Sequence, residues 1–156
     1  MLFTVPILYD VVNPRFRQLI EDKLSRQHFM KHIGFGLTKI EPGYIEGEAL
    51  MDTALQQQDG LVHGGVTATV GDIVTGFAAF SLVRDEDRVV TSDLKISYFR
   101  PGRGEKVLAR GWVIKPGSRL HYCEGEIYVA TGNEYTLIAK VYSIMAVIRG
   151  KDKELR

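Results

Sequence analysis

The fold of this chain is decided by residues 64–82, which read GGVTATVGDIVTGFAAFSL. Asp72 is the only ionisable residue in this stretch, and most of the other positions are small or apolar. The frequent valine and threonine would suit a strand, but the stretch is long for a strand without a turn signal. A helix that is apolar on all sides is normally a buried helix. The stretch therefore predicts one long helix inside the protein.

A second, amphipathic helix is predicted before it. Asn13-Pro14 supplies an N-cap residue and then a proline, which is favoured at the first position of a helix. We expect this helix to end before Gly34. Its apolar residues recur at helical spacing between charged ones and are Phe16, Leu19, Ile20 and Leu24.

The remaining apolar segments predict six strands separated by turn signals. Because short turns join most of them, we expect an antiparallel sheet. An antiparallel sheet wrapped around one buried helix describes the hotdog fold, of class α+β. A single sheet covers only one side of that helix, and the apolar remainder predicts at least a dimer. The expected strands are 35–41, 44–51, 89–99, 105–115, 119–130 and 135–148.

Composition places the chain among globular proteins and excludes several classes of site. Its 156 residues, 45% apolar and 25% charged, fit one domain over 1–156, with an N-terminal extension at about 1–12 and a charged tail at 150–156. A net charge of +1 argues against a nucleic-acid or membrane partner. The single cysteine, Cys123, excludes an internal disulfide and a cysteine-based zinc site, and no histidine spacing suggests a metal. With no signal peptide or membrane span recognised, we expect a cytoplasmic protein.

Two features of the long helix could carry chemistry. His63-Gly64-Gly65 falls where the helix begins, and glycine allows a ligand to approach the unpaired N–H groups there. Such a place is a candidate oxyanion hole, although two glycines also simply permit a tight turn. Asp72 is costly inside an apolar helix unless it is paired, so it is either a site residue or a carboxylate held by a neighbouring arginine or amide.

The spacing of these two features suggests how they would meet. Gly64 and Asp72 are eight positions apart, or roughly 12 Å along one helix at 1.5 Å per residue, and cannot act on one atom. If two such helices lie antiparallel across a two-fold axis, Gly64 of each approaches Asp72 of the other. Each of the two sites then has an N–H donor for a carbonyl oxygen and a nearby carboxylate, as acyl transfer requires.

The pattern Gln57…His63-Gly64-Gly65…Asp72-x-x-x-Gly76 resembles the signature of hotdog-fold acyl-CoA thioesterases. The nearest branch is the PaaI-like one, which includes phenylacetyl-CoA and 4-hydroxybenzoyl-CoA thioesterases. The resemblance covers about residues 30–148. It extends to the strand at 91–101 and to the turn at 115–119.

The resemblance implies a role for each matching residue. The N–H of Gly64 polarises the thioester carbonyl, and Asp72 of the facing subunit acts as nucleophile or as general base. Gln57 holds the thioester or the water, and Thr91 places a hydroxyl near the water. Some members carry Ser or Thr four residues after the acid, where this chain has Gly76, so that role does not transfer.

The other candidates have a plainer structural explanation beside the functional one. His63 could touch the substrate, but a histidine just before a helix more often caps it. Arginines beside turns could bind CoA phosphates, although surface arginines are common. The candidate substrate-binding or CoA-binding residues are Gly65, Arg100, Gly117, Ser118 and Arg119.

We therefore expect hydrolysis of an acyl-CoA or aryl-CoA to the free acid and CoA-SH. The resemblance implies no metal and no separate cofactor, since coenzyme A is part of the substrate. The expected assembly is a homodimer or a dimer of dimers, that is, a homotetramer. Two alternatives stay open: a module that binds acyl-CoA without cleaving it, and a hydroxyacyl-thioester dehydratase or hydratase. The sequence does not set the acyl group.

Overall fold

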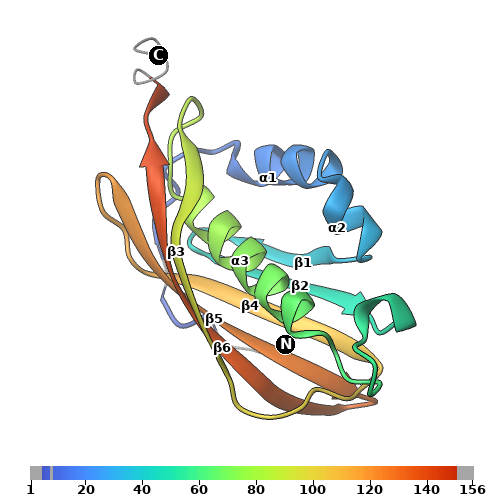
Figure 1. The fold of residues 1–156 in the computed structure, drawn as a ribbon. Coiled ribbons are helices and arrows are strands. Elements are labelled where there is room, and N and C mark those ends of the chain that lie inside the picture. The colour runs from blue at the N-terminus through green and yellow to red at the C-terminus, as the bar shows by residue number, and fades with distance from the viewer. Residues whose placement is uncertain (1–4, 8, 151–156) are drawn as a thin grey trace.

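The computed structural model describes residues 5–7 and 9–150 and consists of one curved antiparallel sheet that partly encloses a long helix (Figure 1). The strand order in the sheet is β1-β2-β4-β5-β6-β3, and every neighbouring pair is antiparallel. The strands are β1 (Gly36–Glu41), β2 (Tyr44–Leu50), β3 (Arg88–Tyr98), β4 (Lys106–Lys115), β5 (Leu120–Thr131) and β6 (Glu134–Ile148). The helices are α1 (Phe16–Ser25), α2 (His28–His32), the 3-10 turn η1 (Thr53–Leu55) and α3 (Gly64–Phe80). The predicted hotdog architecture and its central helix are thus confirmed.

Helix α3 lies close against the sheet because a glycine of β4 faces the backbone of the helix. A Cβ atom placed on Gly111 of β4 would lie 2.6 Å from the carbonyl carbon of Val74 in α3, which is backbone and cannot move aside. The face of α3 toward the sheet is fully buried. Its buried residues include Thr67, Val70, Val74, Thr75, Ala78 and Ala79.

The opposite face of α3 is only partly covered in the single chain. Gly65 is exposed, and Ala68, Thr69, Asp72, Ile73 and Gly76 are half-buried. This agrees with the expectation that one sheet covers only one side of the helix. The uncovered face borders β3, which is an edge strand of the sheet.

The predicted N-terminal helix is two helices. It begins two residues later than predicted, since Arg15 and not Asn13 is the N-cap of α1, and no side chain caps it. Asn13 and Pro14 belong to the turn before the helix, where the Asn13 side-chain oxygen accepts a hydrogen bond from the Arg15 N–H at 2.9 Å. However, Gln27 is extended (φ −86°, ψ 99°) and separates α1 from α2. The resulting change of direction lets Met30 of α2 join the same core as Ile20 of α1. The predicted end before Gly34, which has φ 66°, is confirmed.

Parts of the expected terminal segments can be placed. Residues 1–4, 8 and 151–156 lie outside the described residues, so most of the predicted charged tail does too. Within the expected extension, the Tyr9 hydroxyl donates to the carbonyl oxygens of Val113 and Ile114, which ties this segment to the end of β4. Among the described helices, none is long and apolar enough to cross a membrane.

An ion cluster fixes the start of β3 to the end of β6. Asp87 is 2% exposed and accepts hydrogen bonds from Arg84, Arg149 and the Gly150 N–H. Burial alone raises the pKa of Asp87, but these hydrogen bonds outweigh it and lower the pKa to about 2. The unfolded-state pKa is near 3.9, so the ionised Asp87 stabilises the fold above about pH 4 and loses this effect as the pH falls toward 2.

We predict that Asp87→Asn lowers the free energy of unfolding at pH 7 by about 2 kcal/mol, because the buried charged hydrogen bonds are lost. The difference from the wild type should shrink as the pH is lowered from 4 to 2, as measured by urea denaturation. Asp85→Asn is the control, since Asp85 forms an exposed pair with Arg15 and should change stability by less than about 0.5 kcal/mol. A difference that is unchanged at pH 2 would contradict this account.

We predict that Gly111→Ala destabilises the protein by about 2 kcal/mol, because the added methyl group meets the backbone of α3. Gly36→Ala in β1 is a matched control, since nothing lies within 4 Å of its new Cβ. Thermal and urea unfolding of both variants would check this. Equal stability of the two variants would show that the close contact does not matter.

Candidate functional site

The first turn of α3 is capped by the side chain that precedes it. His63 has extended backbone angles (φ −64°, ψ 135°), and its Nδ1 accepts a hydrogen bond from the Gly65 N–H at 2.9 Å. The structure therefore assigns His63 the capping role that sequence reasoning favoured. It also occupies the N–H of Gly65. In the part of the chain that the structure describes, the Gly64 N–H has no hydrogen-bond partner and remains available to an anion.

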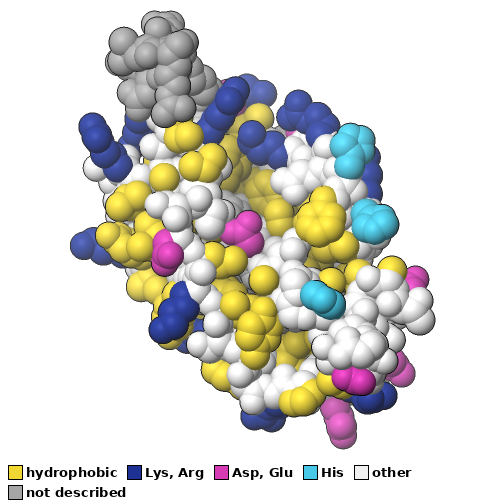
Figure 2. All heavy atoms as spheres, in the orientation of Figure 1, with side chains coloured by type: hydrophobic (Ala, Val, Ile, Leu, Met, Phe, Trp, Pro, Cys, Tyr) yellow, Lys and Arg dark blue, Asp and Glu magenta, His cyan; other side chains and the backbone are white. Residues whose placement is uncertain are grey.

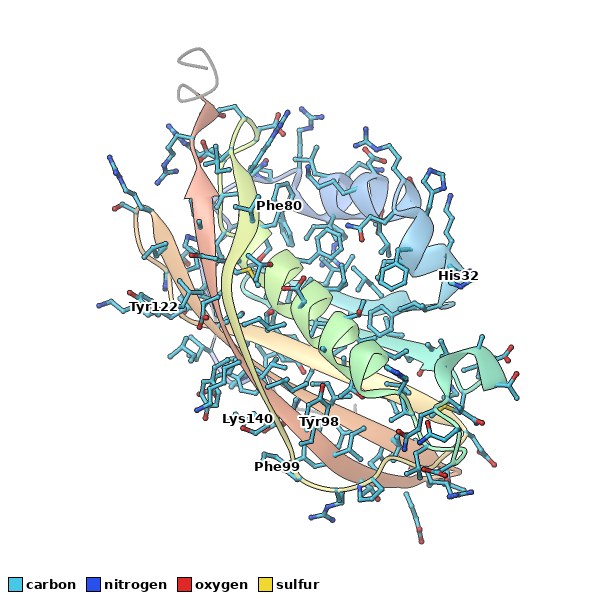
Figure 3. All side chains as sticks on the ribbon, viewed as in Figure 1. His32, Phe80, Tyr98, Phe99, Tyr122 and Lys140 are labelled. Carbon is cyan, nitrogen blue, oxygen red and sulfur yellow. The ribbon has the colours of Figure 1, made fainter. Side chains whose placement is uncertain are left out.

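A tyrosine from the edge strand holds the same turn from the other side. The Tyr98 hydroxyl donates to the carbonyl oxygen of Gly64 at 2.8 Å, and Tyr98 lies beside the start of α3 (Figure 3). Sequence reasoning did not single out Tyr98 as a site residue. Only the packing of β3 against α3 brings it there, because 34 residues separate the two positions.

Asp72 is held by a hydroxyl rather than by a cation. It lies on the uncovered face of α3, and its Oδ1 accepts a hydrogen bond from the Thr91 Oγ1 at 2.7 Å. No ion pair of Asp72 occurs among the described residues. The contact brings together two of the predicted site residues, from α3 and β3.

A bulge in β3 aims Thr91 at this carboxylate. Thr91 pairs with Met145 and Asp93 pairs with Ile144, so Ser92 is an extra residue in the edge strand. Thr75 cannot take the same role, because it is fully buried and its hydroxyl donates to the carbonyl oxygen of Gly71. Thr91 is therefore the hydroxyl that this chain presents to the acid.

Gln57 lies in the loop before α3, away from these contacts. Its backbone closes a turn with Leu61 and Gly60, and its side chain is half-buried. Its side chain makes no hydrogen bond to Gly64 or Asp72 within residues 5–7 and 9–150. The loop itself is held by Arg103, which donates to the carbonyl oxygen of Asp59.

The predicted CoA-binding residues fall into two separate groups. Arg100 is exposed in the loop after β3, whereas Gly117, Ser118 and Arg119 form the hairpin between β4 and β5. These groups lie near opposite ends of β5, whose twelve residues span roughly 35 Å at 3.3 Å per residue. One chain therefore cannot bring both groups to the same phosphate.

A pocket of about 700 Å³ opens beside Asp72, between α1, α3 and the first residues of β3. In Figure 2 it corresponds to a yellow, apolar hollow with dark blue Lys and Arg atoms above it. Phe80 lies at the far end of α3 from Gly64 (Figure 3). The pocket is lined by Lys23, Arg26, Gln27, Asp72, Ile73, Gly76, Phe77, Phe80, Arg88, Val89, Val90, Thr91 and Met145.

Neither a metal centre nor a reactive thiol is found in the described part of the chain. No group of three or more His, Cys, Asp or Glu side chains there is placed to hold a metal ion. Cys123 is 1% exposed, and burial raises the pKa of its thiol to about 12. Cys123 is a residue of the hydrophobic core.

We predict that His63→Ala lowers the free energy of unfolding by about 1 kcal/mol, because the Gly65 N–H loses its cap. His63→Asn should restore most of this stability, since asparagine is among the best capping residues. Urea denaturation of the two variants at neutral pH would test this. If His63→Ala is as stable as the wild type, the cap contributes nothing.

Comparisons with known proteins find a matching family model and several similar proteins. The family model described as the thioesterase superfamily matches residues 59–136, half of the chain, including Asp72 and Thr91. The crystal structure of a thioesterase family protein from Silicibacter pomeroyi is 32% identical, with a TM-score of 0.85, and the match covers 86% of this chain and 99% of that one.

Two further proteins are similar to this chain, one over a shorter part of it and one at lower sequence identity. The proofreading thioesterase EntH of Klebsiella pneumoniae is 29% identical over 53% of this chain and 61% of its own length. The E. coli PaaI protein from the phenylacetic acid degradation operon is 18% identical, with a TM-score of 0.78 over 87% of this chain and 95% of its own, and supports the fold alone. Fold, family model and the Silicibacter relative together show that this chain belongs to the thioesterase superfamily of hotdog proteins.

Proposed function

We propose that this protein hydrolyses acyl-CoA thioesters to the free acid and CoA-SH. The observation that carries the proposal is Asp72, a carboxylate on the central helix that Thr91 orients and that opens into a pocket with an apolar wall. An apolar wall of this kind suits the hydrocarbon part of a thioester, and the carboxylate lies at one end of it. Membership of the thioesterase superfamily supports thioester hydrolysis in general.

The site becomes complete only with a second copy of the chain. Gly64 and Asp72 are both on α3, roughly 12 Å apart at 1.5 Å per residue, so one chain cannot present both to a single carbonyl. The open edge of β3 and the uncovered face of α3 lie on the same side of the molecule. In the proposed dimer, two β3 strands pair antiparallel, and Gly64 of each subunit faces Asp72 of the other. A dimer of dimers would contain the same pair of sites.

In the proposed reaction, the Gly64 N–H donates to the thioester oxygen as it becomes an oxyanion. Asp72 acts in one of two ways. As general base, it takes a proton from water, which attacks the carbonyl carbon; the C–S bond then breaks and the thiolate leaves with that proton as CoA-SH. As nucleophile, it attacks the carbon itself, the thiolate leaves, and water then cleaves the resulting anhydride.

Two observations favour hydrolysis over the alternative functions. A dehydratase or hydratase needs a histidine base beside the acid, but His63 is engaged in capping α3. His121 is 3% exposed, and burial lowers the pKa of its imidazole. A module that only binds acyl-CoA would have no need for a hydroxyl-oriented carboxylate opening into the pocket.

The proposal is tested at both of its catalytic groups. Asp72→Asn should lower kcat by about 10²–10⁴-fold in a thiol-release assay, because the base or nucleophile is lost. Gly64→Pro should lower it about 10²–10³-fold by removing the donor N–H. Proline suits this first helical position, and His63 already has the extended angles that proline requires of its predecessor.

Gly64→Ala is the matched control, since it keeps the N–H and its Cβ meets the Tyr98 hydroxyl at an ordinary 3.4 Å. It should stay close to the wild type, as should the capping variant His63→Asn. Near-normal turnover by Asp72→Asn would overturn the assignment.

Mixing subunits tests the arrangement across the dimer. A mixed dimer of Asp72→Ala and Gly64→Pro subunits would have one site with both substitutions and one site with neither. Co-refolding the two inactive variants should therefore restore activity, with half of the sites active in every mixed dimer. If the mixture stays inactive although mixed dimers are isolated by tag selection, each site uses Gly64 and Asp72 of the same chain.

A further inference from the structure

The pocket beside Asp72 ends in a group of cations. Lys23 reaches it from α1, Arg26 from the position directly after α1, and Arg88 from the start of β3. Of the described residues that line the pocket, Asp72 alone is acidic. The net charge of the lining is therefore positive, and Figure 2 shows Lys and Arg atoms gathered at this end of the hollow.

The part of the pocket between Asp72 and these cations is apolar. It follows α3 from Asp72 to Phe80, a length of roughly 12 Å at 1.5 Å per residue. Its walls suit a hydrocarbon chain rather than the amide-bearing pantetheine arm of CoA. They consist of Ile73, Gly76, Phe77, Phe80, Val89 and Met145.

Two of the cations lack a carboxylate partner. Among the described residues, neither Arg26 nor Arg88 has a carboxylate oxygen within 4 Å. In the described part of the chain, the Arg26 guanidinium donates to the backbone carbonyl of Asp22, whose side chain accepts from Gln18.

In the described loop before Arg88, Asp85 pairs with Arg15 and Glu86 pairs with Arg84. Asp87 is already bound by Arg84 and Arg149. Lys23 lies 4.8 Å from the centre of the Phe80 ring, at the apolar wall. The two arginines can therefore receive an anion without first breaking an ion pair.

We infer that this pocket binds an acyl group whose far end carries a carboxylate, so that the preferred substrate is an ω-carboxyacyl thioester. The inference rests on the proposed function, which places the thioester at Asp72. The acyl chain then runs along the apolar wall, and its terminal carboxylate meets Arg26 and Arg88. The phosphates of CoA are a second possible source of negative charge, but they would reach these arginines only if the polar pantetheine arm occupied the apolar wall.

Two substrates of equal chain length test the inference. Suberoyl-CoA and octanoyl-CoA have the same carbon chain and differ in the free carboxylate at its end. The double variant Arg26→Gln/Arg88→Gln should lower kcat/KM for suberoyl-CoA about tenfold or more, the effect of losing a charged hydrogen bond. It should leave kcat/KM for octanoyl-CoA unchanged. Arg17→Gln, on α1 but outside the pocket, is the control and should change neither value.

The contrary results are distinct. An equal loss for both CoA substrates that disappears with octanoyl-pantetheine, which lacks the nucleotide phosphates, would assign the arginines to CoA and overturn the inference. No loss with either substrate would overturn it as well.

A measurement without turnover separates this inference from the proposed function. Calorimetry should show that suberate binds the wild type more tightly than octanoate does, and that the double variant loses the difference. If the wild type cleaves octanoyl-CoA but shows no such difference, the inference alone fails. If it cleaves no thioester yet binds suberate through the two arginines, the proposed function fails and the anion site stands.

Discussion

The whole structure depends on how closely α3 can approach the sheet that encloses it. Gly111 allows this contact, since a side chain there would meet the backbone at Val74. With one face buried so tightly, a carboxylate on α3 can reach water only from the opposite face of that helix. Asp72 lies on that face, and β3 runs beside it to supply the Thr91 hydroxyl. The constraint that packs the core therefore also positions the acid.

The edge strand connects the two ends of the proposed site. Near its start it orients Asp72 through Thr91, and at its end it holds the carbonyl of Gly64 through Tyr98. The Asp87 cluster anchors the start of the same strand to the end of β6. A strand held at both ends by hydrogen bonds can keep two distant turns of one helix in constant positions.

Local sequence signals were enough for most of the fold, because each predicted element had its own period or turn. They failed at Gln27, since no glycine or proline marks the break between α1 and α2. The acid and the capping turn were also visible, because a lone carboxylate in an apolar helix is conspicuous. Tyr98 and the cations Arg26 and Arg88 could not be found in this way. They reach the site through contacts between segments distant in sequence, which no local pattern records.

The bulges in the two edge strands limit how a strand of another molecule can pair with the sheet. Both edge strands contain one, at Ser92 in β3 and at Thr38 in β1, and β1 has only six residues. A bulge interrupts the regular spacing of the free N–H and C=O groups, so an incoming strand can pair with only part of each edge. The run from Asp93 to Tyr98 is long enough for a closed, symmetric pair. An exposed edge strand can pair with further copies of the chain and lead to aggregation. The bulges disfavour such continued edge-to-edge pairing.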